Sequence, residues 1–201
     1  MYGLKGYADL IGAVARLRAL GLPLSAVLVG DPVRPSTWYQ RPGRRTAARL
    51  VGVADEERRL QMMIERLDLA DAVIWVRHAD DLGSIYPALD LICAPSRGPE
   101  LGRPLLEGQA YGRPVIATGS RTGAGIIDHG RTGVLAPPDD EEALAAALRP
   151  LVEDEQLRGR IGAAAYRHAA ASYTADIVGA RVLTVYDRVS HAVVSPRRSS
   201  R

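Results

Sequence analysis

The 201-residue sequence has one cysteine and no long apolar run. Cys93 has no second cysteine to pair with, so an internal disulfide is excluded. Its place in the apolar run Asp-Leu-Ile-Cys-Ala-Pro predicts a buried, unreactive thiol. The longest apolar runs, such as residues 73–76 and 91–94, are too short to span a bilayer. The N-terminal residues lack the basic start, apolar core and cleavage site of a secretory signal, so we expect a cytoplasmic protein.

A large excess of charge of one sign is also missing. The formal net charge is +3, and the chain is 24% charged and 47% hydrophobic, as in ordinary globular proteins. Basic residues gather in 34–49 and 196–201, which we interpret as a solvated loop and a disordered tail. The alternative is peripheral contact with an anionic membrane surface or with an acidic substrate. No motif that reads nucleic acid accompanies these charges, so nucleic acid is not an expected partner.

Short apolar runs alternate with segments of helical periodicity. Strands are predicted at residues 25–30, 72–76, 91–94, 114–118 and 134–136. Helices are predicted at residues 7–20, 55–69, 82–89, 141–152, 156–173 and 175–192, with a loop over 31–53 and Asp139 as a helix N-cap. Continuous apolar strands alternating with helices indicate an α/β fold, a doubly wound, Rossmann-like parallel sheet covered on both faces.

The loop after residues 91–94 carries the clearest sign of a ligand site, because ligands of such sheets bind beyond the carboxyl ends of the strands. Gly102 lacks the Cβ that would keep a ligand from the backbone, and Pro104 suits the first turn of a helix. A helix that begins there offers free N–H groups to a diphosphate. Glu107, one turn later, can accept two hydrogen bonds from a vicinal diol such as a ribose. The alternative is an acidic residue that only complements the helix dipole.

Residues 96–118 resemble the donor-site signature of the group 1 (glycogen-synthase-like) retaining glycosyltransferases of the GT-B fold. That signature has two glutamates around a glycine-containing turn, followed by Gly-x-Pro-Val-Ile-Ala. This chain has Pro-Glu-Leu-Gly-Arg-Pro-Leu-Leu-Glu at 99–107 and Gly-Arg-Pro-Val-Ile-Ala-Thr at 112–118. The resemblance covers residues 4–189. It implies that residues 1–192 are the C-terminal, nucleotide-sugar-binding half of such an enzyme and that 193–201 form the tail.

The resemblance also implies roles for particular residues. Glu107 would bind the nucleotide's ribose, Glu100 would contact the transferred sugar, and Lys5, the chain's only lysine, would neutralise the leaving diphosphate. The diphosphate or sugar would be held by backbone N–H groups, and the base by main-chain groups after residues 73–76; the candidates are Leu101, Gly102, Arg103, Arg77 and His78. No cofactor or metal is expected, since the spacing in His-Ala-Asp-Asp at 78–81 suits a helix cap better. The other histidines, His168 among them, are expected to be exposed.

Three departures from the family pattern bear on catalysis. Six residues separate Glu100 from Glu107 where the family has seven, and alignment on Gly102 puts Pro99 at the first glutamate's place. The first strand of the domain and the arginine after it are absent, which is expected to expose an edge of the sheet. Gly125 stands where a glutamate is frequent.

The implied activity is transfer of a hexosyl-type sugar from a nucleotide diphosphate sugar to a hydroxyl acceptor with retention, as in polysaccharide biosynthesis. The acceptor would be bound by a missing N-terminal domain or a partner chain. One alternative is a non-catalytic nucleotide-sugar-binding module that needs or has lost that partner. Another is a nicotinamide-dependent oxidoreductase, although residues 119–125 do not form Gly-x-Gly-x-x-Gly after a first strand.

Overall fold

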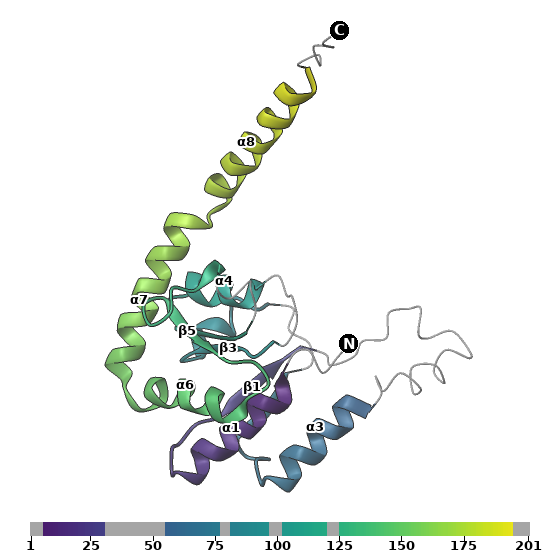
Figure 1. Cartoon of the computed structure of the whole chain (residues 1–201). Coiled ribbons are helices and arrows are strands. Elements are labelled where there is room, and N and C mark those ends of the chain that lie inside the picture. Colours follow the sequence, from purple (N-terminus) through teal and green to yellow (C-terminus); the bar gives the residue numbers. More distant parts are fainter. Residues whose placement is uncertain (1–5, 31–54, 77–80, 97–101, 120–124, 195–201) are drawn as a thin grey trace, which may run out of the picture.

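The computed structural model describes residues 6–30, 55–76, 81–96, 102–119 and 125–194 as alternating helices and strands (Figure 1). In chain order the elements are α1 (Tyr7–Ala19), β1 (Ala26–Val29), α3 (Asp55–Arg66), β2 (Val73–Val76), the 3-10 turn η2 (Tyr86–Ala88), β3 (Ile92–Ala94), α4 (Arg103–Ala110), β4 (Val115–Thr118), β5 (Gly133–Ala136), α6 (Glu141–Glu153), α7 (Glu155–Ser172) and α8 (Ala175–Val194). All five predicted strands are confirmed. The predicted loop 31–53 lies outside the described residues.

Two local predictions are wrong. The helix expected at 82–89 is a turn followed by the short η2, and Leu89 is already extended, with φ −99° and ψ 143°. Pro87 has no N–H to donate and disfavours helical backbone at the residue before it, so a longer helix does not form. The N-cap of α6 is Asp140, whose carboxylate accepts a 2.8 Å bond from the N–H of Ala143. Asp139 instead takes the turn conformation before it, with φ 57°.

The parallel sheet is in two pieces among the described residues. β1 pairs with β2, and β4 lies between β3 and β5, all in parallel. No described strand joins β1 to β3. The expected exposed edge is therefore two edges inside the sheet rather than one at its border.

Helices cover both faces of the three-stranded piece, as the doubly wound prediction requires. Ile116 of β4 packs in one apolar cluster with Leu144 of α6 and Leu17 of α1. Its neighbours Val115 and Ala117 point to the other face and pack in a second cluster with Leu105 of α4.

Helix α1 connects the two pieces. Ile11 and Val14 pack under β1 and β2 with Leu60 of α3, while Ala13 and Leu17 belong to the cluster of α6 and β4. Arg16 of α1 also pairs with Glu141 of α6 through a 2.9 Å contact. The two pieces are thus joined by side-chain packing around α1.

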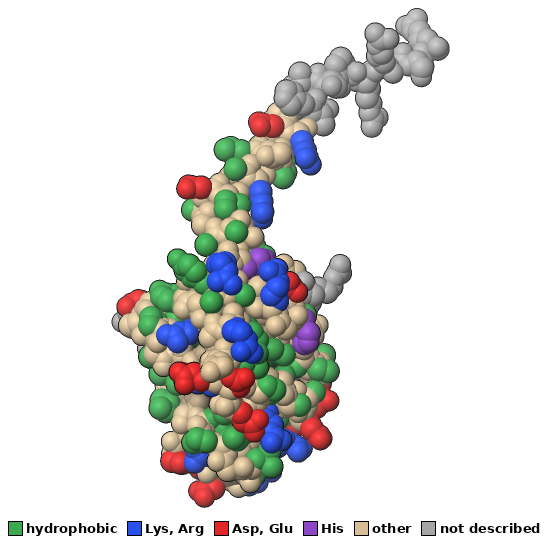
Figure 2. All heavy atoms as spheres, turned by 90° about the vertical axis from the view of Figure 1, so that its left-hand side faces the viewer, with side chains coloured by type: hydrophobic (Ala, Val, Ile, Leu, Met, Phe, Trp, Pro, Cys, Tyr) green, Lys and Arg blue, Asp and Glu red, His purple; other side chains and the backbone are tan. Residues whose placement is uncertain are grey.

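The last helix, α8, projects away from the rest of the molecule (Figure 1). Its apolar side chains are exposed and alternate with charged ones along the projection (Figure 2). The exposed large apolar residues are Val178, Val182, Leu183, Val185, Tyr186 and Val189. In the described part of the chain, no helix combines the length and the apolar character needed to cross a membrane.

Candidate functional site

The start of α4 has the geometry expected of a ligand-binding helix end. Gly102 is buried and lies in the left-handed region with φ 67°, which favours glycine, and α4 begins directly after it with Pro104 in its first turn. The carbonyl of Gly102 accepts bonds from the N–H groups of Leu105 at 3.0 Å and Leu106 at 3.2 Å. The amides at the very start of the helix have no such partner within the helix, so they face outward.

Glu107 is held from both sides one turn into α4. Its Oε2 accepts a 2.6 Å hydrogen bond from the hydroxyl of Tyr86, and its Oε1 accepts a 3.1 Å bond from Nη2 of Arg103. The Glu107 side chain is 31% exposed and that of Arg103 is 75% exposed. The bond to Tyr86 is therefore the better shielded of the two, and Oε1 is the oxygen that solvent or a ligand can reach.

Tyr86 is fixed in turn by Tyr111, which follows α4. Their rings stack with centroids 5.3 Å apart and planes 6° from parallel. Burial raises the pKa of the Tyr86 hydroxyl above its ordinary value, and the hydrogen bond to Glu107 and that carboxylate's charge raise it further. The hydroxyl consequently stays protonated and acts as a donor to Glu107 throughout the physiological range.

A cavity of about 800 Å³ adjoins this carboxylate. Its lining includes Arg103, Glu107, Tyr86 and the end of β3 at Ser96, and it continues between β1 and β3. The carbonyl of buried Ser96 accepts a 3.0 Å bond from the hydroxyl of Thr118. This contact fixes the carboxyl ends of β3 and β4 relative to each other beside the site.

The start of α1 lies at the same edge of the sheet. Gly6, with φ 62°, approaches β3 so closely that a Cβ on it would lie 1.7 Å from the carbonyl oxygen of Pro95. Only glycine allows this contact, so the glycine of the Lys-Gly pair serves to dock α1 beside the loop that precedes α4.

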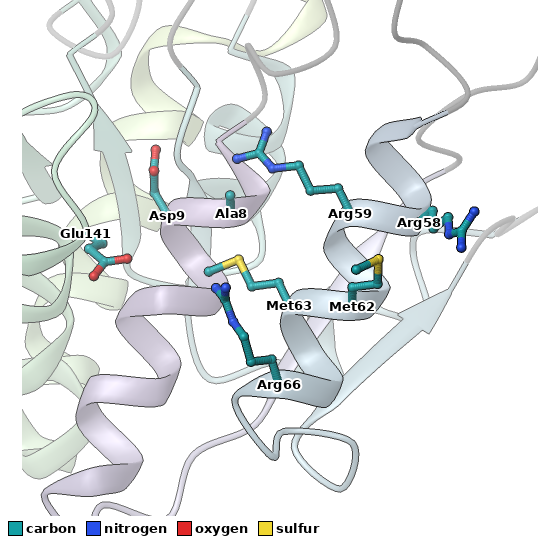
Figure 3. A pocket seen from close by; sticks show the side chains of 8 residues that line it. All are labelled: Ala8, Asp9, Arg58, Arg59, Met62, Met63, Arg66 and Glu141. Carbon is teal, nitrogen blue, oxygen red and sulfur yellow. The ribbon is translucent and has the colours of Figure 1, made fainter. Parts of the chain in front are cut away.

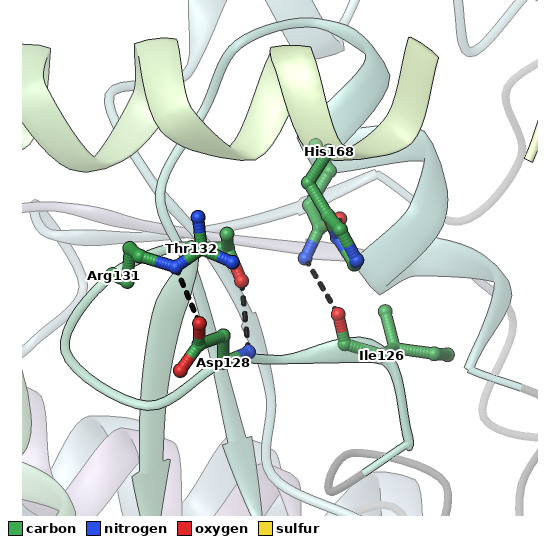
Figure 4. Close-up of polar contacts among 6 residues, drawn as sticks. Ile126, Asp128, Arg131, Thr132 and His168 are labelled. Carbon is green, nitrogen blue, oxygen red and sulfur yellow. Dashed lines mark hydrogen bonds and ion pairs between the residues drawn. The ribbon is translucent and has the colours of Figure 1, made fainter. Parts of the chain in front are cut away.

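Buried polar contacts hold the back of α4 (Figure 4). The fully buried side chain of Gln109 donates a 3.2 Å bond to the carbonyl of Ile126, and its Oε1 lies 3.2 Å from Nδ1 of His168 on α7. The following turn is closed by the N–H of Asp128, which donates to the Thr132 hydroxyl at 2.9 Å. The expectation that His168 is exposed was wrong, because α7 packs on α4 and half buries the ring.

A second cavity, of about 650 Å³, lies between α1 and α3 (Figure 3). It is lined by the helical side chains of Ala8, Asp9, Arg58, Arg59, Met62, Met63, Arg66 and Glu141. It shares no lining residue with the cavity at Glu107. No group of three or more histidine, cysteine, aspartate or glutamate side chains suited to a metal occurs within the described ranges.

A family model described as glycosyl transferases group 1 matches residues 2–168, which include this whole site. The chain belongs to the group 1 glycosyltransferases. The match begins before α1 and extends into α7, so every strand described above falls within the family's own pattern.

Relatives within this glycosyltransferase family are longer than the chain. It is 34% identical to a D-inositol 3-phosphate glycosyltransferase of Stackebrandtia nassauensis, over 98% of this chain and 42% of that protein. It is 33% identical to a phosphatidyl-myo-inositol mannosyltransferase of Mycolicibacterium smegmatis, over 71% of this chain and 37% of that protein. The chain therefore spans less than half the length of these relatives.

Solved structures of glycosyltransferases share the fold. HepE of Anabaena in complex with UDP and glucose superposes with a TM-score of 0.70 at 25% identity, over 94% of this chain and 45% of that one. The C-terminal domain of a group 1 glycosyltransferase from Francisella tularensis gives 0.71 at 24% identity, over 87% of this chain and 83% of that one. The second match identifies the chain's fold as that of a C-terminal GT-B domain.

The structure brings together three of the predicted site residues. Gly102, Arg103 and Glu107 meet at the start of α4. The other predicted residues, Lys5, Arg77, His78, Glu100 and Leu101, lie outside the described residues. Sequence analysis missed Tyr86 and its partner Tyr111. Tyr86 lies 21 residues before Glu107, and no local spacing links two residues that meet only through the packing of β3 and α4.

Proposed function

We propose that this chain is the donor-binding half of a glycosyltransferase that moves a sugar from a nucleotide diphosphate sugar to a hydroxyl acceptor with retention. The observation that carries the proposal is the placement of Glu107 at the mouth of a cavity beyond β3, with one carboxylate oxygen held by Tyr86. The fixed carboxylate presents its other oxygen to a ligand. Ligands of doubly wound sheets bind at this edge.

A ribose is the group that best fits Glu107. An ionised carboxylate accepts hydrogen bonds at both oxygens, and the two hydroxyls of a ribose are adjacent donors. Oε1 is paired with an exposed arginine, whose ion pair is weak in solvent, so ribose hydroxyls replace it at small cost. Arg103 is then released toward the diphosphate, which its guanidinium and the outward amides of the α4 start attract.

The remaining roles follow the family resemblance. Lys5 would neutralise charge on the departing diphosphate, and Glu100 would orient the sugar. Main-chain groups of Leu101 would contribute to the diphosphate site, and those of Arg77 and His78 would meet the base. The transferase would act by fixing the donor and stabilising charge on the leaving group.

Two findings guide the choice of ligands. HepE, at 25% identity, was solved with UDP and glucose, so UDP is the first nucleotide to test. Two relatives are named for inositol-containing acceptors, which makes a hydroxylated, inositol-type acceptor the first to try. The acceptor would be bound by polypeptide outside this chain, whose residues correspond to 42% of the first of those relatives.

Calorimetric titration with UDP, GDP, ADP and NAD tests the proposal, with Glu107→Gln as the variant. We expect saturable binding of one nucleoside diphosphate and at least a tenfold weaker affinity in the variant, because a neutral amide offers only one acceptor oxygen. Glu153→Gln is the matched control, since Glu153 is a partly exposed helical glutamate paired with Arg149 in the same i,i+4 pattern. Failure of the folded chain to bind any of the diphosphates would refute a donor site, and binding of NAD alone would favour an oxidoreductase.

A binding module without transfer is the second candidate. The observation that favours it is Pro99 at the place of the family's first glutamate, with six residues between Glu100 and Glu107. Release of UDP from UDP-glucose, measured with and without an acceptor, separates the two functions. Tight UDP binding with no release under either condition supports the module.

A further inference from the structure

The two pieces of the sheet leave an open lane between them. We use "the lane" for the space bounded by the facing edges of β1 (Ala26–Val29) and β3 (Ile92–Ala94). The cavity of about 800 Å³ is lined by every residue of both strands, so it fills the space where the sheet is interrupted. β1 pairs with β2 alone and β3 with β4 alone among the described strands.

The backbone of β1 presents hydrogen-bonding groups to the lane. The N–H groups of Ala26 and Gly30 bond to carbonyls at the two ends of β2, at 2.8 and 2.9 Å. Because successive residues of a strand direct their backbone groups to opposite edges, Val27 and Val29 face the lane. The carbonyl of Val29 has only a long 3.4 Å contact from the hydroxyl of Tyr7.

The same reasoning applies to β3. The N–H of Ile92 donates to the carbonyl of Pro114 at 2.9 Å, so Ile92 and Ala94 face β4. Cys93, between them, directs its backbone N–H and carbonyl into the lane. Two rows of backbone donors and acceptors therefore face each other across one space.

The walls above and below the lane are apolar. Leu10 and Val14 of α1 and Leu148 of α6 line the cavity on one face of the sheet. Tyr86 and Leu89 line it toward the face that α4 covers. A strand in the lane would direct alternate side chains into these two walls, and both walls favour apolar side chains.

We propose that the lane is the docking site for an apolar β-strand of a second polypeptide, which pairs in parallel with β1 and β3 and makes the sheet continuous. Backbone edges on both sides select an extended strand, since a helix or small molecule satisfies its own polar groups or has too few. All five described strands are parallel, so a parallel occupant continues the same ladder on both sides.

A second copy of the chain is a poorer occupant. Each of its described strands already pairs within its own sheet, and α8 is helical. Polypeptide that carries the rest of a group 1 transferase fits better, because this chain spans only 42% of the first relative and 45% of the matched HepE chain. The proposal concerns the sheet and does not depend on nucleotide binding.

Amide hydrogen exchange of the full chain, followed by NMR, tests this. The probe is a synthetic peptide of five consecutive valine and isoleucine residues flanked by lysines, and the control peptide carries proline at the centre. We expect the valine peptide to slow exchange of the Val27, Val29 and Cys93 amides at least tenfold, with little change at Leu28, whose amide faces β2. Proline removes an N–H and breaks the new ladder, so the control peptide should leave all four unchanged.

A nitroxide on either end of the peptide reports its direction. Parallel docking broadens Gly30 and Ser96 from the C-terminal label, and Ser25 and Leu91 from the N-terminal label. Val27→Pro removes one lane-facing N–H while leaving the bonds to β2, and should weaken peptide binding at least fivefold with β4 amides still protected.

Other outcomes overturn the proposal. Lane amides that are slow without peptide would mean that the chain's own residues fill the lane. Protection that rises with chain concentration would assign the lane to a second copy. Equal effects of the two peptides, or no effect on a chain whose β4 amides are protected, would exclude strand docking.

Discussion

The two pieces of the sheet bury their strands to different extents. In β4, at the centre of the three-stranded piece, all four residues are buried. In β1 only Ala26 and Leu28 are buried, and in β2 Ile74 is 54% exposed. One piece is thus enclosed by helices on both faces, whereas the other is a ribbon with a single apolar face that rests on α1 and α3. Glu107 lies on the enclosed piece, so the candidate site has the more rigid support.

The enclosed piece should show the largest loss of stability when its core is truncated. Leu144 of α6 is fully buried among residues of α1 and β4. Leu144→Ala should lower the free energy of unfolding by about 3–5 kcal/mol, because it removes packed atoms and leaves a cavity. Urea denaturation measures the change, and Leu20→Ala, at an exposed leucine of similar size, should change it by under about 0.5 kcal/mol.

The ribbon should respond locally to the same kind of substitution. Leu60 is fully buried between α3 and the strands β1 and β2. Leu60→Ala should destabilise the ribbon by about 2–4 kcal/mol and speed exchange of the β1 and β2 amides. Amides of β4 should stay protected, and UDP affinity should change less than threefold. Equal acceleration in β4 would show that the two pieces unfold as one unit.

Cys93, on the lane side of β3, should make stability depend on alkaline pH. Burial raises the pKa of its thiol to about 12 from 9.0. The folded state therefore keeps a proton that the unfolded state loses above pH 9, and stability falls as pH rises. Between pH 8 and 10 this group should remove about 1.4 kcal/mol of stability. Cys93→Ala should flatten that part of the profile; an unchanged profile in urea titrations would contradict the assignment.

The smallest effect tests the site without disturbing its support. Tyr86→Phe removes the 2.6 Å bond to Glu107 and keeps the stacked ring. We expect UDP binding to weaken about five- to tenfold, or roughly 1 kcal/mol, since the carboxylate is then less well oriented. Tyr111→Phe is the matched control, because it keeps the stack and removes a hydroxyl that has no contact with Glu107 among the described bonds. Equal losses in the two variants would assign Tyr86 a packing role only.

Local sequence features sufficed for most elements and for one part of the site. The apolar runs that became β1 to β5 were recognisable because buried parallel strands are continuously apolar. Gly102 and Pro104 marked the start of α4 because each favours a backbone conformation needed at that place. Asp139 and Asp140 could not be ranked, since either carboxylate can cap a helix and the choice depends on where the preceding turn ends.

Features that depend on packing could not be predicted. The contact of Tyr86 with Glu107 joins residues on separate elements, and the burial of His168 depends on how α7 lies on α4. The interruption of the sheet was expected only as an exposed edge. Its position between β1 and β3 follows from strand order, which neither periodicity nor composition specifies.

The bridging role of α1 has a consequence for the order of events during synthesis. Arg16 and Glu141, which pair in the finished molecule, are 125 residues apart. At about 5–20 residues per second, a ribosome adds the intervening chain in roughly 6–25 s. Through that interval Ala13 and Leu17 lack the α6 side chains that cover them. The nascent chain therefore exposes an apolar helix face for seconds, long enough for a chaperone to bind it before α6 arrives.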